Sequence, residues 1–204
     1  MPTIYDLKPR FQALLRPFVK ILVDAEVTAN QITWTGLVVS ALAGLLIWIT
    51  DGHWATLLLL PEILFIRMAL NAIDGMMARE HGQATTAGAF LNELSDVAAD
   101  AVLYMPIAVV AGVSPVLVGL VVAGGALVEM AGVLAHLTNS DRRYDGPFGK
   151  SDRAVFWGGL AVLLALGLGG WWVNWVLGVA VALSAWTTYR RCRKAMEAGD
   201  AGAA

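Results

Sequence analysis

Long apolar blocks alternate with short polar clusters along the whole chain. The first block, residues 27–50, contains no charged side chain, and about 20 helical residues are enough to cross the hydrocarbon core of a bilayer. Five more apolar segments follow, separated by Gly, Asp, Ser, Pro or charged clusters. The pattern predicts an all-α integral membrane protein with six transmembrane helices, at residues 27–50, 53–79, 87–111, 114–138, 153–169 and 171–189.

The segment before the first block has a different pattern. Between Leu7 and Leu22, apolar residues recur at helical spacing, and most of the basic residues fall on the other side of the helix. This pattern is typical of a helix that lies on an anionic leaflet. We expect one membrane domain, residues 1–194, in which an interfacial amphipathic helix (1–26) precedes the spans, and a flexible tail at residues 195–204.

Composition and charge narrow the class of protein. Hydrophobic residues make up 58% of the 204-residue chain and charged residues 15%, whereas a soluble domain has roughly 45 to 50% and about 25%. The net charge of -2 and the scattered basic residues exclude a nucleic-acid interface. Every basic residue except Arg67 falls on one side of the six-span topology. The positive-inside rule therefore predicts that both termini are cytoplasmic, in a bacterial-type inner membrane.

Two of the predicted spans carry polar residues near their cytoplasmic ends. Asn71 and Asp74 lie three residues apart in the second span, while Asn92, Asp96 and Asp100 lie four apart in the third. Each set therefore lies along one helical face, and the short connection EHGQATT makes the two helices antiparallel neighbours. Carboxylate and amide oxygens suit a hard cation such as Mg²⁺, Mn²⁺ or Ca²⁺. The sequence therefore predicts a divalent-cation site between the two faces.

Residues next to this set suit a phosphate group. Gly75 and Gly88 permit close approach to the backbone. The planar guanidinium of Arg79, about one turn beyond Asp74, could clamp a phosphate oxygen. The alternative is a polar contact between helices in which Asp74 pairs with Arg67 or Arg79 and the asparagines bridge the helices.

These residues carry a family resemblance. Residues 71–79, NAIDGMMAR, are followed after eight residues by GAFLNELSD at 88–96. The two segments resemble the signature D-x2-D-G-x2-A-R-x8-G-x3-D-x3-D of the CDP-alcohol phosphotransferases, also called CDP-alcohol phosphatidyltransferases, in every spacing. The family is also similar in having six spans, an interfacial N-terminal helix and a T-x-N-x-x-T element before the first span, here residues 28–33.

The resemblance implies a role for each matching position. In the family, the signature aspartates bind two divalent cations that hold the CDP pyrophosphate, and the fourth is the proposed base for the acceptor hydroxyl. By position, Asp74 would be a metal ligand, and Asp96 would be the catalytic base and a metal ligand. The resemblance also implies a homodimer and a set of residues near the nucleotide and its phosphates: Thr28, Asn30, Gly75, Arg79 and Gly88.

The chain departs from the signature at its first and third aspartates, which are Asn71 and Asn92. An amide oxygen can coordinate a cation but brings no negative charge, so Asp100 or Glu93 would have to restore it. A bacterial branch of the family is similar in this Asn/Asp/Asn/Asp arrangement. We expect one strongly and one weakly held ion, magnesium or manganese, on five oxygen donors: Asn71, Asp74, Asn92, Asp96 and Asp100.

Basic residues around the start of the fifth span are candidates for binding a phosphorylated or acidic acceptor: Arg142, Arg143, Lys150 and Arg153. Family members that use polyol phosphates are similar in placing basic residues in this region. The alternative is that these residues only anchor the cytoplasmic side of the bundle. Arg67 and Glu129 lie inside predicted spans, where they could pair with each other or contact substrate.

These features predict an enzyme of phospholipid biosynthesis. It would transfer a phosphatidyl group from CDP-diacylglycerol to a hydroxyl acceptor and release CMP, with glycerol phosphate, inositol phosphate, serine, glycerol or another headgroup as the acceptor. Two alternatives stay open. The chain could transfer a phospho-alcohol from a CDP-alcohol to diacylglycerol, or it could be a catalytically impaired lipid-nucleotide binding protein. A transporter is disfavoured, because the sequence has no internal repeat and no mid-span helix break.

Overall fold

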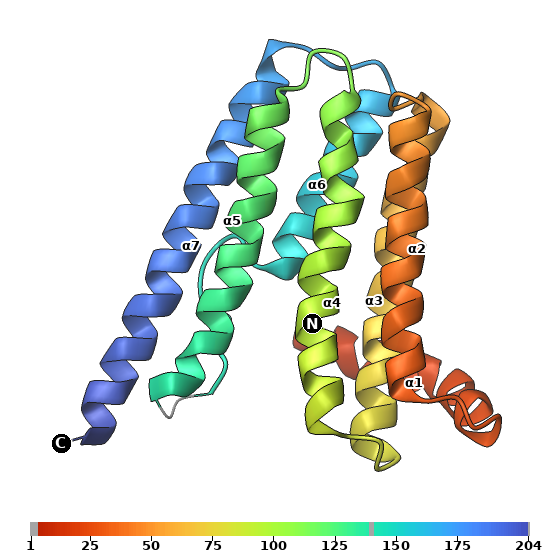
Figure 1. Ribbon diagram of the computed structural model, residues 1–204, viewed down its shortest axis with the longest axis vertical. Coiled ribbons are helices and arrows are strands. Elements are labelled where there is room, and N and C mark those ends of the chain that lie inside the picture. Colours follow the sequence, from red (N-terminus) through yellow and green to blue (C-terminus); the bar gives the residue numbers. More distant parts are fainter. Residues whose placement is uncertain (1–3, 139–140, 204) are drawn as a thin grey trace. The chain divides into compact units, whose positions relative to one another are not determined.

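The computed structural model describes residues 4–138 and 141–203, and every regular element in this part of the chain is a helix (Figure 1). The all-helical prediction is confirmed, and each predicted span overlaps one of the helices from the second onward. The elements are α1 (Ile4–Asp24), α2 (Ala29–Ile49), α3 (Trp54–Glu80), α4 (Thr86–Tyr104), η1 (Met105–Val109), α5 (Pro115–Leu134), η2 (Ala135–Thr138), α6 (Lys150–Ala165) and α7 (Trp171–Ala203).

Three helical segments among the described residues are long and apolar enough to cross a membrane: α2, α3 and the α5–η2 segment Pro115–Thr138. On α2, Val38, Leu42 and Leu45 recur at helical spacing and are exposed. An exposed apolar stripe of this kind needs a lipid or protein cover. The structure thus supports three spans by length and composition, and the six-span topology with cytoplasmic termini stays a prediction.

The helices form two compact units. Among the described residues, the first consists of 4–42 and Glu62–Ala99, and the second of Ala43–Pro61, 100–138 and 141–203. The boundaries fall inside α2, α3 and α4, so each of these helices contributes to both units. Signature residues 71–96 all belong to the first unit, whereas Asp100 and the basic residues at 142–153 belong to the second.

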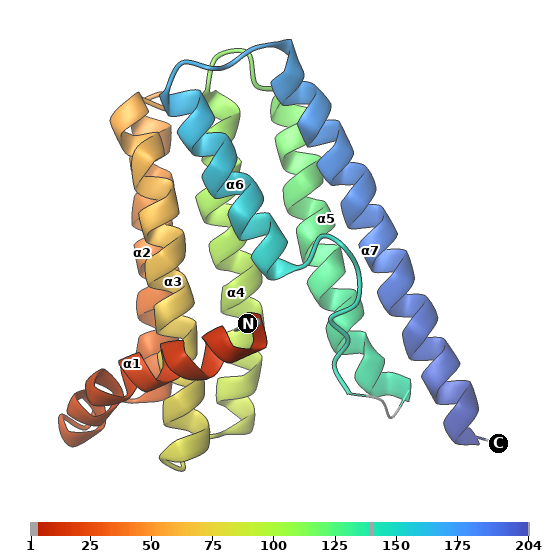
Figure 2. The same cartoon turned by 180° about the vertical axis from the view of Figure 1, so that it is seen from behind.

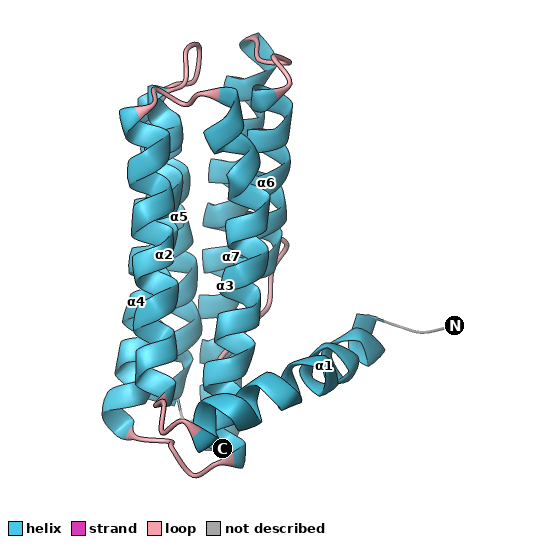
Figure 3. Cartoon of the chain, turned by 90° about the vertical axis from the view of Figure 1, so that its right-hand side faces the viewer, coloured by secondary structure: helices cyan, strands magenta, loops and turns pink. Residues whose placement is uncertain are grey.

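In the first unit, α1 packs on the neighbouring ends of α2 and α3 and crosses α3 obliquely (Figures 2 and 3). Leu15 and Val19 of α1 are buried in an apolar cluster with Ile73 and other residues of α2 and α3. The amphipathic pattern is therefore only partly a lipid-facing one, because one strip of the apolar face packs against protein. Leu14 and Phe18 remain exposed.

In the second unit, α5 and α7 pack side by side (Figure 1). The loop before α6 is fastened to both helices. The backbone N–H of Arg143 donates to the carbonyl of Gly132 in α5 at 3.1 Å, and the N–H of Phe148 donates to Thr187 Oγ1 in α7 at 3.1 Å. Gly146 makes this close approach possible. It has φ +113°, and a Cβ built there would lie 2.5 Å from Thr187 Cγ2, so a larger residue would collide with α7.

Candidate active site

The signature residues of α3 and α4 come into direct contact in the first unit. Nδ2 of Asn71 donates a hydrogen bond to Oδ1 of Asp96 at 3.1 Å. The approach of the two polar faces, predicted from their spacing, is confirmed by this bond. Asp74, one turn further along α3, is buried and accepts a hydrogen bond at Oδ2 from Thr33 Oγ1 of α2 at 2.8 Å. The signature positions of α3 therefore form hydrogen bonds with both neighbouring helices, α2 and α4.

Thr33 was not among the predicted site residues, although it ends the T-x-N-x-x-T element. Its hydroxyl also donates to the backbone carbonyl of Ala29 at 3.1 Å. A buried carboxylate needs hydrogen-bond partners, and Thr33 of α2 supplies one of them to Asp74. The signal was the position of Thr33 inside a polar element that precedes a long apolar run.

The guanidinium of Arg79 lies over Gly75. A Cβ built on Gly75 would lie 3.0 Å from Nη2 and 3.2 Å from Nη1 of Arg79. The missing side chain at position 75 therefore leaves space for the guanidinium, and the phosphate-binding role of the two residues stays a prediction. Arg79 itself is exposed, so its charged end is accessible to a ligand.

The beginning of α4 meets the beginning of α2 at Gly88. A Cβ there would lie 2.8 Å from Asn30 Oδ1 and 2.9 Å from Thr85 Oγ1. Thr85 precedes α4, and its hydroxyl accepts from the backbone N–H of Gly88 at 3.0 Å, which caps the helix. Two of the predicted nucleotide-end residues, Asn30 and Gly88, are thus direct neighbours.

Thr28 and Gln83 fix the start of α2. The Thr28 hydroxyl accepts from the backbone N–H of Gln31 at 3.3 Å, and Oε1 of Gln31 accepts from the N–H of Thr28 at 2.8 Å. This reciprocal pair is a capping box. Gln83, in the α3–α4 loop, accepts from the N–H of Ala29 at 2.7 Å and donates to the carbonyl of Val27 at 3.3 Å. Gln83, which sequence reasoning missed, ties the signature loop to α2.

The remaining predicted metal ligands differ in their surroundings. Asn92 is half-buried, and no hydrogen-bond partner for its side-chain amide occurs in the described part of the chain. Asp100 lies in the second unit, where Nη2 of Arg153 donates to its Oδ2 at 3.1 Å. The carboxylate of Asp100 is therefore engaged by an arginine that was predicted to bind the acceptor.

Arg153 belongs to a buried ion network around Glu129 in the second unit. Nη2 of Arg153 lies 3.0 Å from Glu129 Oε1, and Nη2 of Arg142 lies 2.8 Å from Oε2. Arg191, which is 1% exposed, lies 3.7 Å from the same carboxylate and donates to the carbonyl of Val128 at 2.7 Å. Glu129 thus binds three arginines of its own unit. The sequence left open a pairing of Glu129 with Arg67, and the ion pairs of Glu129 are with these three residues.

Arg142 and Arg143 also line a shallow, open depression of about 340 Å³ on the surface, together with Tyr144 and Asp145. The Arg142 guanidinium lies 5.3 Å from the centre of the Tyr144 ring, and Arg143 Nε lies 3.0 Å from Asp145 Oδ2. A hydrogen bond from Lys194 to Asp145, together with the positive charge of Arg143, lowers the pKa of the Asp145 carboxyl. The loop is therefore stabilised by charge pairing at neutral pH.

The chain is similar to known proteins along most of its length. Residues 26–186 match the model of the CDP-alcohol phosphatidyltransferase family. The chain is 46% identical over 198 residues to the inner membrane protein YnbA of Escherichia coli, covering 95% of this chain and 96% of that protein. It is 27% identical over 150 residues to the archaetidylinositol phosphate synthase of Aeropyrum pernix, covering 74% and 73%.

Solved structures show the same fold. The Mycobacterium tuberculosis phosphatidylinositol phosphate synthase with CDP-DAG bound superimposes with a TM-score of 0.73 at 16% identity, covering 88% of this chain and 92% of that one. The same enzyme in complex with manganese and citrate gives a TM-score of 0.73, covering 88% of each chain.

The fold and the site define a helical membrane protein whose signature residues meet between α3 and α4. With a family match over residues 26–186 and 46% identity to a relative along nearly the whole chain, the protein belongs to the CDP-alcohol phosphatidyltransferase family.

Proposed function

We propose that this protein is an enzyme of phospholipid biosynthesis that transfers a phosphatidyl group from CDP-diacylglycerol to a hydroxyl acceptor and releases CMP. The observation that carries this proposal is the hydrogen bond from Asn71 to Asp96, which joins the two halves of the signature. The solved neighbour with CDP-DAG bound and the relative named as an archaetidylinositol phosphate synthase support a lipid-linked donor.

The donor set fits a hard divalent cation. It offers the carboxylates of Asp74 and Asp96 and the amide oxygens of Asn71 and Asn92, and Mg²⁺ and Mn²⁺ prefer such oxygens. Within the described residues, no three His, Cys, Asp or Glu side chains converge as a ligand group. With two carboxylates, the set suits one firmly held ion and a weaker second one. The neighbour solved with manganese supports a divalent cation at this site.

The chemistry follows from the positions of the protein's own groups. When bound, the cation would neutralise the pyrophosphate and stabilise the departing CMP. Asp96, oriented by the Asn71 amide, accepts the proton of the acceptor hydroxyl. The acceptor oxygen then forms a bond to the phosphorus that carries the diacylglycerol, and the bond from that phosphorus to the bridging oxygen of CMP breaks.

The phosphate-binding residues surround this carboxylate pair in the first unit. Arg79 binds phosphate oxygens of the nucleotide with its guanidinium, for which Gly75 leaves room. Gly88 and Asn30 border the nucleotide end, and Thr28 shapes it by capping α2. Asp100 supports the second unit through Arg153 and supplies negative charge one turn beyond Asp96.

We further propose that the acceptor is bound by the basic residues of the second unit, Arg142, Arg143 and Lys150, with Arg153 positioned by Glu129. The open surface depression of about 340 Å³ that Arg142 and Arg143 line supports this assignment. A phosphorylated polyol has the charge and the hydroxyl groups that such a site would recognise.

The membrane arrangement completes the proposal. We infer six spans, cytoplasmic termini, an active site facing the cytoplasm, and a homodimer in a bacterial-type inner membrane. The asparagine pair would then mark a bacterial branch of the family. The similarity to an inner membrane protein over 96% of that relative supports the placement. The three helical segments that are long enough and apolar enough to span agree with it.

The test is CMP release from CDP-diacylglycerol by the purified protein in Mg²⁺ or Mn²⁺, screened against a panel of hydroxyl acceptors. We expect acceptor-dependent release that falls at least about 100-fold in Asp96→Asn. Asp24→Asn, which removes an exposed carboxylate at the end of α1, is the matched control and should keep full activity. Binding of CDP-diacylglycerol without release for any acceptor would instead support the binding-protein alternative. Release from CDP-choline or CDP-ethanolamine with diacylglycerol as acceptor would support the reversed donor use.

A further inference from the structure

Helix α7 is longer than a membrane span requires. Its 33 residues extend about 50 Å at about 1.5 Å each, against a hydrocarbon core of roughly 30 Å. Its first 19 residues carry no charge, and the charged residues begin at Arg190. In the membrane placement proposed above, the helix therefore leaves the hydrocarbon near Trp186–Arg190 and continues into the headgroup region and the cytoplasm.

The two faces of α7 have different partners. One face is buried at helical spacing from Val173 to Ala195 and packs within the second unit. The other face is exposed and changes character along its length. It begins with Trp175 and Val179, which are 69% and 45% exposed, and continues into an aromatic and basic stripe. We call the residues Trp186, Tyr189, Arg190, Arg193, Lys194 and Glu197 the terminal stripe; they line a surface groove of about 230 Å³.

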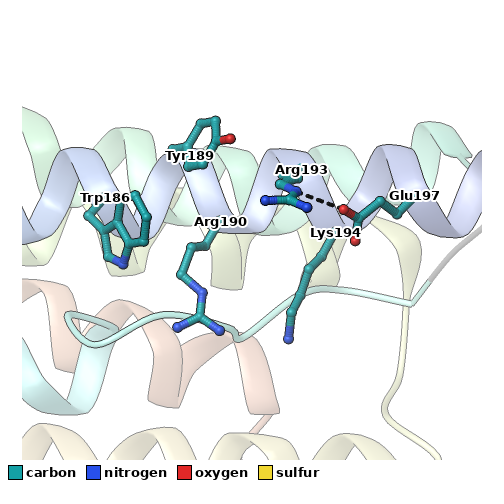
Figure 4. A pocket seen from close by; sticks show the side chains of 6 residues that line it. All are labelled: Trp186, Tyr189, Arg190, Arg193, Lys194 and Glu197. Atoms are coloured by element: carbon teal, nitrogen blue, oxygen red, sulfur yellow. Dashed lines mark hydrogen bonds and ion pairs between the residues drawn. The ribbon is translucent and has the colours of Figure 1, made fainter.

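Within the terminal stripe, Trp186, Arg190 and Lys194 are spaced four residues apart and project to the same side of α7 (Figure 4). The Trp186 and Tyr189 rings lie 5.6 Å apart. Arg193 pairs with Glu197 at 2.7 Å. Aromatic rings at the level where a helix meets water are typical of the membrane interface, so this level is where lipid phosphates would lie.

Two of the three basic residues in the terminal stripe are paired with a carboxylate, and the third is not. Lys194 is bound by Asp145, and Arg193 by Glu197. Arg190 is exposed and has no hydrogen-bond or ion-pair partner in the described part of the chain. Its neighbours on the projecting edge are an indole and an ammonium group. An anionic phosphate placed here would meet a guanidinium fork next to an ammonium group.

We propose that the terminal stripe binds the headgroup of an anionic phospholipid. Arg190 and Lys194 contact the phosphate, Trp186 and Tyr189 lie at the glycerol level, and the acyl chains follow the exposed apolar residues Trp175 and Val179. This continuous apolar path favours a membrane lipid over free phosphate, because free phosphate would make no use of it. The proposal rests on the membrane placement and not on the transferase reaction.

The experiment is native mass spectrometry of the full-length protein in a non-ionic detergent, titrated with phosphatidylglycerol or with phosphatidylcholine. We expect phosphatidylglycerol to bind more tightly, and Arg190→Gln to weaken its binding about fivefold, as expected for one interfacial charge. Glu197→Gln should strengthen the binding, because it removes the opposing charge. Inorganic phosphate should not displace the lipid. Asp51→Asn, which changes one exposed charge in the loop between α2 and α3, is the control and should change phosphatidylglycerol binding less than twofold.

Three results would overturn the proposal: equal binding of the two lipids, no greater loss of phosphatidylglycerol binding in Arg190→Gln than in Asp51→Asn, or displacement by inorganic phosphate. A change in the monomer–dimer ratio of Arg190→Gln without a change in bound lipid would overturn it in favour of a contact between copies. CDP-diacylglycerol binding is measured in the same samples. Its loss in the wild-type protein would count against the proposed function, whereas loss of phosphatidylglycerol preference alone would count against the terminal stripe.

Discussion

The side-chain amide of Asn71 and the carboxylate of Asp96 lie 3.1 Å apart and join α3 to α4. The family signature resembles this chain in spacing but carries aspartate at both positions. Two carboxylates at this distance repel each other unless a cation lies nearby. An amide that donates to the carboxylate needs no cation, so the two helices of this protein are held together before any metal binds.

This relationship predicts that the stability of Asn71→Asp depends more strongly on a divalent cation than the stability of the wild type. Without a divalent cation, the variant should unfold at a midpoint at least about 2 °C lower, because a hydrogen bond of about 1 kcal/mol or more is replaced by repulsion. Addition of Mg²⁺ or Mn²⁺ should raise the midpoint of the variant more than that of the wild type. Thermal unfolding in detergent with EDTA, and then with each metal, measures both effects.

Asn71→Ala separates the effect of the lost hydrogen bond from the effect of the added charge. It also removes the hydrogen bond, but it adds no charge, so it should lower the midpoint without gaining sensitivity to metal. An equal metal response in Asn71→Asp and Asn71→Ala would show that position 71 does not lie within reach of the cation.

Much of the first unit could be predicted from spacing alone. The i, i+3 relation of Asn71 and Asp74 and the short loop to α4 were enough to predict that α3 and α4 meet through their polar faces. The hydrogen bond from Thr33 to Asp74 could not be predicted in this way. Thr33 lies 41 residues away in the sequence, and periodicity within one helix does not determine which residue of another helix faces it.

Gly88 provides a second prediction. In Gly88→Ala the new methyl group would lie 2.8 Å from Asn30 Oδ1, so Asn30 must move away from the nucleotide end of the site. We expect the efficiency of CMP release to fall on the order of tenfold or more, because small displacements of positioning groups are costly. Kinetics at several CDP-diacylglycerol concentrations measure the effect.

Gly159→Ala is the matched control for Gly88→Ala. Gly159 is a helical glycine of α6 with no atom within 4 Å of a built Cβ. Alanine should be neutral or slightly stabilising there, because it favours the helix by roughly 0.5 to 1 kcal/mol. Equal losses of activity in the two variants would contradict the proposed role of the space at Gly88.

Glu129 provides a third prediction, based on the buried network of the second unit. Glu129→Gln would leave Arg142, Arg153 and Arg191 with less compensating charge. We expect a loss of about 3 to 5 kcal/mol in the free energy of unfolding, because breaking a buried ion pair leaves uncompensated charge. The midpoint of unfolding, followed by gel filtration after heating, measures the loss.

Glu197→Gln is the exposed counterpart of this substitution. Its partner, Arg193, is a solvent-exposed side chain one turn away on α7. Such pairs contribute about 0.5 kcal/mol or less, so the unfolding midpoint should barely change. A similar midpoint for both variants would mean that Glu129 is not an essential counter-charge.

The sequence was less informative for this network. Its apolar pattern predicted the helices, and the charges of Glu129 and Arg153 indicated residues that need partners. Three arginines from different segments converge on one carboxylate, and Asp100 joins through Arg153. Which opposite charges pair across helices depends on rotations and depths that the charge pattern does not contain. For this reason the sequence predicts Asp100 as a metal ligand but does not predict its ion pair with Arg153.

Asp145 provides the last prediction, a dependence of stability on pH. The hydrogen bond from Lys194 and the charge of Arg143 lower the pKa of this carboxyl below its ordinary value of 3.8. A group whose pKa is lowered in the folded state stabilises the fold above the unfolded value and loses that effect as the pH falls through the folded value. Asp145→Asn should therefore unfold at a lower temperature than the wild type at neutral pH, and the difference should narrow below about pH 3.8.

Asp24→Asn controls for the loss of one carboxylate and should follow the wild type. A gap between Asp145→Asn and wild type that is constant from pH 7 to pH 3 would show that these contacts do not depend on the charge of Asp145, and that the loop before α6 is held mainly by its backbone bonds to α5 and α7.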